Sequence, residues 1–188
     1  MYHAIVRRRV VGLFAAVSNG NARPVLEGLA PRFEHFFLGD HALGGSRFTL
    51  EKTRLWYERL YRLLPDISFD LRAMRISGPP WNTLVAVDWL ESNSGTDGVR
   101  TFTPGVHVVR LAWGRMTYIG IYPDTVGVVT TLQRLSRAGV AEATAEKILS
   151  IAEPGDFGPR GGHFPAGCSK DLRLLQTRDL RGQALRGG

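Results

Sequence analysis

The spacing of hydrophobic residues in the first third of the chain predicts three helices. Between residues 3 and 18, apolar side chains recur every three or four positions, which places them on one face of a helix. A short second helix, which Asn21 is suited to cap, is expected through about residue 29, and a longer one over residues 50–64, which Thr49 is suited to cap. Between them, alternation at residues 32–37 predicts a short strand, followed by a glycine-rich loop.

After the third helix the pattern changes to alternation, which is typical of half-buried strands. Turn-forming residues separate successive strands, so the strands are expected to pair as an antiparallel meander. The expected strands are residues 67–77, 83–92, 99–114 and 116–124. Pro104 and Gly105 lie inside the third of these strands and indicate a bulge or kink. Helices followed by a meander indicate an α+β domain.

The chain is expected to contain one folded domain, residues 1–153, and a tail. Two helical segments, residues 125–139 and 141–152, are expected to follow the last strand as a C-terminal extension. Residues 154–188 are rich in glycine and arginine, which predicts a flexible tail with room for one short helix around residues 172–176.

Composition excludes several classes of protein. The 188 residues carry a net charge of +7, but the arginines are interspersed with acidic residues and no zinc-finger or base-stacking pattern is present. Binding of nucleic acid through the basic tail is therefore kept only as the third and weakest hypothesis. The dense triplet Arg7–Arg9 is explained by a solvated helix face. Cys168 is the sole cysteine, which rules out an internal disulfide. With no stretch of roughly 20 apolar residues, no membrane segment is expected, and a cytoplasmic protein is the default.

Five segments taken in order resemble the SnoaL-like branch of the nuclear transport factor 2 superfamily. They are FFLGDHALGGSR, LWYERLYRLLPD, SGPPWNTLVAVDW, GVHVVRLAWGRM and IYPDT, and the resemblance covers about residues 3–140. It implies a cone-shaped α+β barrel in which N-terminal helices pack against a strongly curved antiparallel sheet, with an apolar pocket at its open end. Relatives include polyketide cyclases, ketosteroid isomerases, epoxide hydrolases and pocket proteins without known activity.

The resemblance implies two alternative functions and a homodimeric state. One function is cofactor-free proton transfer, as aldol cyclisation or isomerisation, on a hydrophobic carbonyl compound. The other is a noncatalytic ligand-binding or dimerisation module of the same fold. Relatives often dimerise through the outer face of the sheet, so a homodimer is expected. The epoxide hydrolase branch needs an arginine inside the pocket, which an outward Arg110 does not supply.

Alternate residues of a strand share a face, so parity sorts the candidate side chains. Val87 and Trp89 belong to the large apolar set of their strand and are expected in the pocket wall, which turns Asp88 outward. Glu91 lies on the Trp89 side, near the strand end, and is expected at the pocket mouth. In the next strand the same argument turns His107 inward.

The resemblance also assigns residues in the last strand. In relatives an acidic residue that ends this strand commonly points into the cavity, and Asp124 occupies that position, with Tyr122 on the same side by parity. Asp124, His107 and Tyr122 are therefore the candidate catalytic residues. Gly120 stands where many relatives carry a histidine or another bulky polar side chain facing the cavity, so either a proton-relay partner is missing or there is room for a larger ligand.

The remaining candidates are expected to bind the ligand. They are His35, His41, Trp56, Val87, Trp89 and Glu91. All four tryptophans, including Trp81 and Trp113, are interpreted as packing and pocket lining because of their large apolar area. His35, Asp40 and His41 are too few and too loop-borne to hold a metal, and neither a metal nor a cofactor is expected.

The candidate cluster suits proton transfer next to a carbonyl group. An apolar pocket raises the pKa of a carboxyl group and makes it a stronger base, while a tyrosine hydroxyl or a histidine N–H can donate to the developing enolate oxygen. Each residue also has a purely structural interpretation. Asp124 can cap the following helix, and His35, His107 and Tyr122 can be ordinary core side chains.

Overall fold

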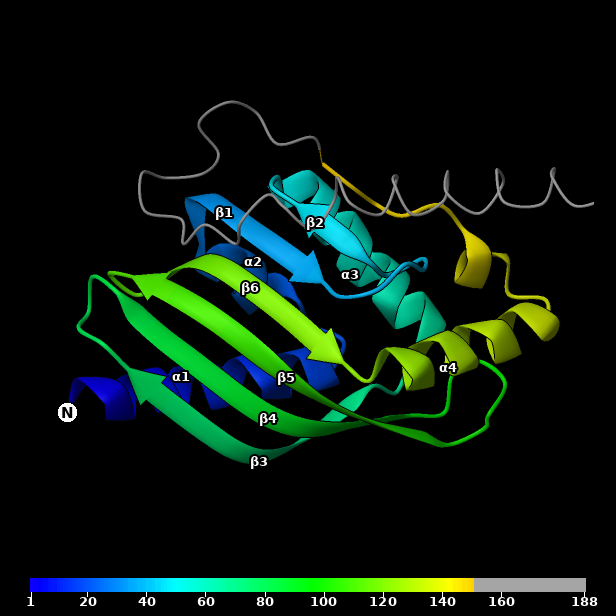
Figure 1. Ribbon diagram of the computed structural model, residues 1–188, viewed down its shortest axis with the longest axis horizontal. Helices are drawn as coiled ribbons and strands as arrows, with labels where there is room; N and C mark the ends of the chain where they lie inside the picture. Colours follow the sequence, from blue (N-terminus) through cyan, green and yellow to red (C-terminus); the bar gives the residue numbers. More distant parts are fainter. Residues whose placement is uncertain (151–188) are drawn as a thin grey trace, which may run out of the picture. The chain divides into compact units, whose positions relative to one another are not determined.

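Within residues 1–150, which the computed structural model describes, six strands form one open, curved sheet (Figure 1). The elements are α1 Tyr2–Ser18, α2 Arg23–Gly28, β1 Leu29–Phe37, β2 Gly45–Arg47, α3 Leu50–Leu63, β3 Ser68–Ser77, β4 Thr83–Asn93, β5 Thr101–Ala112, β6 Arg115–Pro123, α4 Thr125–Arg137 and the 3-10 helix η1 Ala141–Thr144. Their order in the sheet is β2-β1-β6-β5-β4-β3. The expected α+β cone fold is confirmed, and the predicted tail, residues 154–188, lies outside the described residues.

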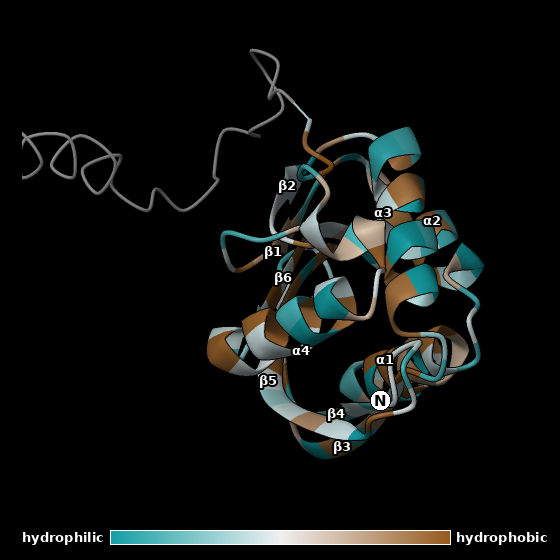
Figure 2. Cartoon of the chain, turned by 90° about the vertical axis from the view of Figure 1, so that its right-hand side faces the viewer, coloured by the Kyte–Doolittle hydropathy of each residue, from teal (hydrophilic) through white to brown (hydrophobic). Residues whose placement is uncertain are grey.

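Helices α1, α2 and α3 pack against the concave face of the sheet (Figures 1 and 2). The buried stripe of α1 contains Val6, Val10 and Val17, and that of α3 contains Trp56 and Leu60. These side chains meet the inward residues of the strands and form one hydrophobic core. Burial of this apolar surface is the main favourable contribution to folding. None of the described helices combines the length and apolarity needed to cross a bilayer.

Local capping accounts for where the helices begin. The Thr49 side chain accepts a hydrogen bond from the backbone N–H of Lys52 (3.3 Å), as expected for the start of α3. The cap of α2 lies one residue later than expected, at Ala22, and the helix begins at Arg23. The side chain of Asn21 still accepts a bond from the Arg23 N–H (3.1 Å), in a turn that precedes the helix.

The first strand pairs in a way that the sequence pattern does not reveal. β1 lies parallel to β6 and antiparallel to the three-residue strand β2, which occupies part of the predicted glycine-rich loop. A strand of three residues is too short to show alternation, so β2 is missed. The parallel pairing joins elements that are far apart in the sequence, and no turn signal marks it.

The expected bulge at Pro104 and Gly105 is wrong. β4 and β5 stay in register through both residues, Leu90 opposite Pro104 and Trp89 opposite Gly105. The irregularity lies between β5 and β6, where Arg110 pairs with Tyr118 but Leu111 pairs with Met116. The extra residue in β6 reverses the alternation of side chains in the rest of that strand.

The expected helix over residues 141–152 is also wrong. Only η1 forms, and no helix includes residues 145–150. Their backbone groups bond to other parts of the domain instead: Arg59 donates to the Glu146 carbonyl (2.7 Å), Arg47 to that of Ile148 (3.3 Å), and the Ser150 N–H to Ser46 (3.1 Å). These tertiary bonds replace the helical ones.

Candidate functional site

A cavity of about 180 Å³ lies between the helices and the concave face of the sheet. Its wall is almost entirely apolar and includes Phe14, Trp56, Trp89, Val109, Ile119 and Leu132. The lining extends from α4, near Leu132, to the β5–β6 turn and the first half of α1. Ile5 and Arg9 belong to this lining and are also exposed, so the cavity reaches the surface beside them.

Glu91 brings a carboxyl group into this apolar wall. It is buried near the end of β4 and accepts a hydrogen bond from the side-chain amide of Asn93 (2.8 Å), with Thr103 as a second hydrogen-bonding neighbour. Burial raises the pKa of Glu91 from its usual 4.5 to about 7, and the two hydrogen bonds oppose part of that rise. The carboxyl group therefore titrates near neutral pH.

His107 is the second titratable group of the cavity. Its Nδ1 accepts a hydrogen bond from the indole N–H of Trp89 (2.7 Å), so the neutral ring carries its proton on Nε2. Burial lowers the pKa of His107 to about 3, which keeps the ring neutral across the physiological range. Phe14 packs edge-on against this ring with centroids 4.9 Å apart. His107 is thus an oriented, uncharged hydrogen-bond donor.

Gly105 determines where the Trp89 indole lies. A Cβ at position 105 would overlap the six-membered ring of Trp89, which rests directly on the β5 backbone at this point. The glycine in the predicted kink therefore permits a close approach of an aromatic ring and does not bend the strand. Through the Trp89 N–H, this packing also fixes the tautomer of His107.

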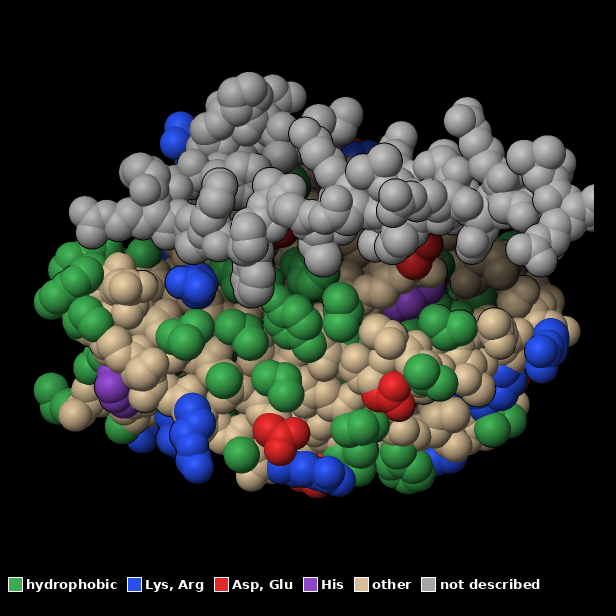
Figure 3. Space-filling model, viewed as in Figure 1, with side chains coloured by type: hydrophobic (Ala, Val, Ile, Leu, Met, Phe, Trp, Pro, Cys, Tyr) green, Lys and Arg blue, Asp and Glu red, His purple; other side chains and the backbone are tan. Residues whose placement is uncertain are grey.

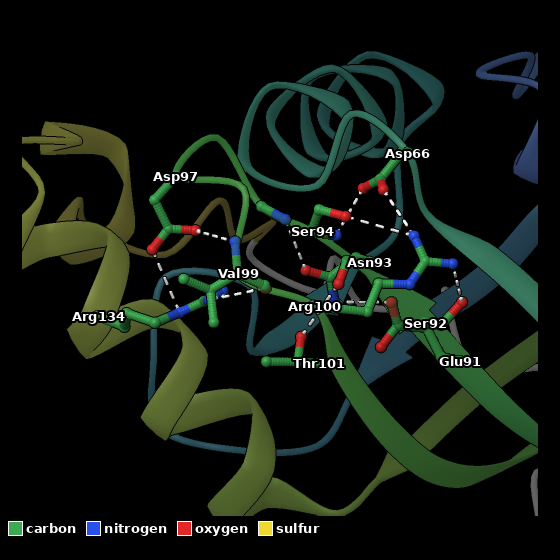
Figure 4. Close-up of polar contacts among 11 residues, drawn as sticks. Asp66, Glu91, Ser92, Asn93, Ser94, Asp97, Val99, Arg100, Thr101 and Arg134 are labelled. Carbon is green, nitrogen blue, oxygen red and sulfur yellow. Dashed lines mark hydrogen bonds and ion pairs between the residues drawn. The ribbon is translucent and has the colours of Figure 1, made fainter.

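The polar surroundings of Glu91 continue into the β4–β5 hairpin loop (Figure 4). Arg100 pairs with Asp66 (3.0 Å) and donates to Ser92 (3.2 Å), and the Asp66 carboxylate accepts from the Ser94 N–H (2.7 Å). Asp66 adds to the rise in the pKa of Glu91, while Arg100 opposes it. These two charges thus shift the pKa of Glu91 from outside the cavity.

A second set of contacts in the same loop fastens α4 over this end of the cavity (Figure 4). Arg134 pairs with Asp97 (3.3 Å) and donates to the carbonyl of Val99 (2.6 Å). Thr131 and Leu132 of α4 line the same cavity as Glu91. The contacts of Arg134 therefore tie the hairpin loop that follows β4 to a helix of the cavity wall.

Four of the predicted site residues lie together in the cavity wall: His107, Trp56, Trp89 and Glu91. Val87 faces the same side of β4 and is fully buried, but it does not line the cavity. Asp88 is exposed on the opposite face, as the parity argument predicts.

The inward orientation expected for Tyr122 and Asp124 is wrong. The bulge in β6 turns Tyr118, Gly120 and Tyr122 to the outer face, where the two tyrosine hydroxyls contact each other (2.5 Å). Asp124 is exposed and caps α4 by accepting from the Val126 N–H (3.1 Å). The expected room beside Gly120 is also absent from the cavity, because Gly120 lies between these tyrosine rings.

Neither His35 nor His41 lines the cavity. His35 is fully buried behind Trp56, where its Nδ1 accepts from the guanidinium of Arg47 (3.1 Å), and burial holds its pKa well below the usual value. His41 lies in a separate surface groove with Asp40 and Lys147. Both positions follow from the β1–β2 hairpin that the sequence pattern does not show.

Three polar groups near the cavity were not predicted. Tyr57 of α3 lines the wall, and Asn93 and Thr103 surround the Glu91 carboxyl group. The signal for the last two was present, since parity places Asn93 and Glu91 on the same face and pairing places Thr103 opposite Glu91. Among the described residues, no group of three or more His, Cys, Asp and Glu side chains is arranged to hold a metal ion.

Comparison with known proteins identifies the fold. No family model matches the chain, and no curated protein matches it. Among solved structures, PrhC from Penicillium brasilianum NBRC 6234 aligns with a TM-score of 0.61 at 14% identity, covering 73% of this chain and 94% of that one. An NTF2-like protein of unknown function from Burkholderia pseudomallei K96243 aligns with a TM-score of 0.60 at 17% identity, covering 66% and 95%.

A third similar structure is wild-type IdmH, a putative polyketide cyclase from Streptomyces antibioticus. It aligns with a TM-score of 0.54 at 20% identity and covers 68% of this chain and 97% of that one. The chain thus has the nuclear transport factor 2-like cone fold, as the resemblance implied. At these identities the likeness establishes the fold alone, so the function has to be argued from the site.

Proposed function

We propose that the cavity binds a hydrophobic, carbonyl-bearing small molecule and that Glu91 removes a proton next to the carbonyl group. The observation that carries this proposal is a buried carboxyl group, with a pKa near 7, in an otherwise apolar wall. A carboxylate released from water in such a wall is a stronger base than one in solution. The similarity to IdmH supports the same class of substrate by fold analogy.

His107 supplies the second half of the proposed chemistry. When a proton leaves the carbon next to a carbonyl, negative charge develops on the oxygen, and a fixed N–H stabilises that charge more than it stabilises the ground state. The Nε2–H of His107 is held for this role by the bond from Trp89 to Nδ1. No cofactor is needed for this step.

The register of the sheet limits the shape of the substrate. Glu91 pairs with Thr103, whereas His107 pairs with Val87, four residues away along β4. Four residues of strand span about 13 Å between Cα atoms. An α-carbon and its carbonyl oxygen lie only two bonds apart, so both side chains can act on a simple ketone only if they extend toward each other. A carbonyl conjugated with an alkene, which loses its proton at the far end of the conjugated system, spans more of this distance and is the better fit.

Hydrogen exchange in heavy water tests the proposal. Incubation with a panel of polyketide-like and steroid-like ketones is expected to give protein-dependent deuterium uptake next to the carbonyl of at least one compound, followed by NMR. Because Glu91 acts as a base only when ionised, the rate should rise with pH through about 7 and then level off. Tight binding of a ketone without any exchange would instead establish the noncatalytic ligand-binding module.

We also propose that the chain forms a homodimer through the outer face of the sheet. The outward residues of β4, β5 and β6 include Ala86, Val106, Val108 and Tyr122, and hydrophobic side chains are spread over this face (Figure 3). Asp88 and Arg110 are the charged residues on the same outward positions of β4 and β5. A mainly apolar sheet face left open to water is typical of a protein interface.

Light scattering at micromolar concentration tests the dimer. The wild-type chain is expected to show twice the mass of one chain, and Val106→Asp is expected to reduce it to one, because the new carboxylate would lie opposite Asp88 on the same face and could not be buried unpaired. The matched control is Val126→Asp at an exposed position of α4, which should leave the mass unchanged. A monomeric wild-type chain would contradict the proposal.

A further inference from the structure

We propose that one end of the molecule binds the surface of an anionic lipid bilayer. This end consists of the β3–β4 turn, the β5–β6 turn and the first half of α1. We call it the tryptophan surface and define it by Trp81, Trp113, Ile5, Arg9 and Arg115. It revises the expectations that Trp81 and Trp113 serve as packing or pocket lining and that no membrane is a partner.

The two tryptophans at the turns do not serve the core. Trp81 is 58% exposed and Trp113 is 73% exposed, and their rings lie against each other with centroids 5.8 Å apart. The backbone N–H of Trp113 donates to the carbonyl of Pro80 (2.7 Å), which holds the two turns side by side. The pair is thus a fixed aromatic protrusion into solvent.

The conformation of the β5–β6 turn also indicates that Trp113 has a role other than folding. Trp113 and Gly114 have φ values of 53° and 76°, which is the left-handed backbone of a tight two-residue hairpin turn. Asparagine, aspartate or glycine suits the first of these positions, whereas a bulky side chain is rare at positive φ. An exposed tryptophan at this position benefits neither the turn nor the core, which points to a role outside the fold.

The charges around the pair are all positive. Residues 2–18, 77–83 and 110–117 contain no aspartate or glutamate. Arg9 donates to the carbonyl of Gly114 (2.8 Å), and Arg115 donates to the carbonyl of Glu27 (2.6 Å). The carboxylate of Glu27 is paired with Arg23 (2.6 Å), so it does not neutralise Arg115. The surface therefore complements a negatively charged partner.

A bilayer fits this combination of features. Tryptophan rings are favoured at the headgroup level of membranes, and arginines beside them are attracted by anionic lipids. The exposed Ile5 adds apolar area next to Arg9, one helical turn away on the same face of α1. Hydrophobic and basic side chains gather at this end of the molecule, near the N-terminus (Figures 1 and 3).

The tryptophan surface lies next to the exposed part of the cavity. Ile5 and Arg9 belong both to the tryptophan surface and to the exposed part of the cavity lining. If the proposed function holds, a hydrophobic ligand could pass between bilayer and cavity without crossing water. The membrane contact itself does not depend on that function, because its evidence is the exposed tryptophans and the uncompensated arginines.

Vesicle co-sedimentation of the full chain tests the proposal. Vesicles of phosphatidylcholine mixed with phosphatidylglycerol are expected to bind the protein, vesicles of phosphatidylcholine alone much less, and added salt should weaken the binding. The double variant Trp81→Ala/Trp113→Ala should bind at least about tenfold more weakly. Arg115→Gln should bind about fivefold more weakly, as expected for one basic residue at the surface.

Matched controls lie elsewhere on the surface. Phe102→Ala removes an aromatic ring that is 63% exposed in β5, and Arg54→Gln removes an exposed charge from α3. Both should bind vesicles like the wild type. Circular dichroism verifies that every variant is folded. As a second readout, brominated lipids should quench tryptophan fluorescence of the wild type, and Trp81→Phe/Trp113→Phe should lose that quenching while buried Trp56 and Trp89 continue to emit.

Three results would overturn the proposal. The first is an absence of binding to the anionic vesicles at low salt. The second is equal binding by the wild type and the Trp81→Ala/Trp113→Ala variant. The third is binding of a DNA duplex, or self-association seen by light scattering, that these two substitutions abolish while vesicle binding is unaffected.

Discussion

Glu91→Gln should abolish most of the proposed proton transfer while making the protein more stable. The amide keeps the shape of the side chain and its bond from Asn93, but it is not a base, so exchange next to the ketone carbonyl should fall by about 10²–10⁴-fold. Ligand binding, followed by fluorescence, should change little because the cavity wall is unaltered.

The gain in stability follows from the raised pKa of Glu91. The folded protein holds this proton up to about pH 7, whereas the unfolded chain releases it near 4.5. Between these pH values the unfolded state binds fewer protons, so the wild type loses stability as pH rises, by up to about 3 kcal/mol in all. Glu91→Gln has no such loss and should be more stable above pH 7, with equal stability near pH 4. Urea unfolding at both pH values measures the difference.

Asp124→Asn is the matched control for this experiment. Asparagine caps a helix about as well as aspartate, and Asp124 is exposed and outside the cavity, so both stability and exchange should match the wild type. If Asp124→Asn removes exchange and Glu91→Gln does not, Glu91 is not the base, and the proposed site is wrong.

Trp56→Ala should have the largest effect on stability, a loss of about 3–5 kcal/mol. The indole is 1% exposed, and its N–H donates to the carbonyl of Leu43 (2.7 Å). It also packs edge-on against His35, with centroids 4.6 Å apart, and lies beneath the guanidinium of Arg47 (5.1 Å). The truncation leaves a hole between the cavity and this buried pair, as well as an unpaired carbonyl.

Denaturant unfolding compares Trp56→Ala with Trp81→Ala, in which the same side chain is lost from the surface. Trp81→Ala should change the free energy of unfolding by no more than about 0.5 kcal/mol. Similar losses in the two variants would show that Trp56 is not the centre of the core. Because Trp56 lines the cavity, Trp56→Ala should also alter the binding of any ketone found by hydrogen exchange.

Parity within a strand predicted the site where the strand is regular. In β4 and β5 the register is unbroken, so alternation placed Trp89, Glu91 and His107 in the same wall without knowledge of the fold. The same argument failed in β6, since one extra residue near Thr117 reversed every side chain after it. No composition signal marks that residue, so parity places Tyr122 on the wrong face. The inward position expected for Asp124 came from the resemblance, and Asp124 instead lies past the end of β6 and caps α4.

The raised pKa of Glu91 also has no signal in the local sequence. From the sequence this residue is a carboxylate near the end of a strand, where exposure to water is expected. Its burial is set by tertiary packing around the cavity, where contacts such as the Arg134–Asp97 pair join segments far apart in the sequence. Long-range contacts of this kind determine the pKa of Glu91 but leave no pattern in the neighbouring sequence. The fold was therefore easier to predict from the sequence than the chemistry of the site.

The hydrogen bonds that hold residues 145–150 against the domain also bear on aggregation. β2 is an outer strand of the sheet, and its free side would offer unpaired backbone groups to a strand of another molecule. The Ser150 N–H bonds to Ser46 on β2, and Arg47 holds the same segment through Ile148. The segment therefore shields this edge, and substitutions that release it should promote fibril-like stacking of sheets before they unfold the core.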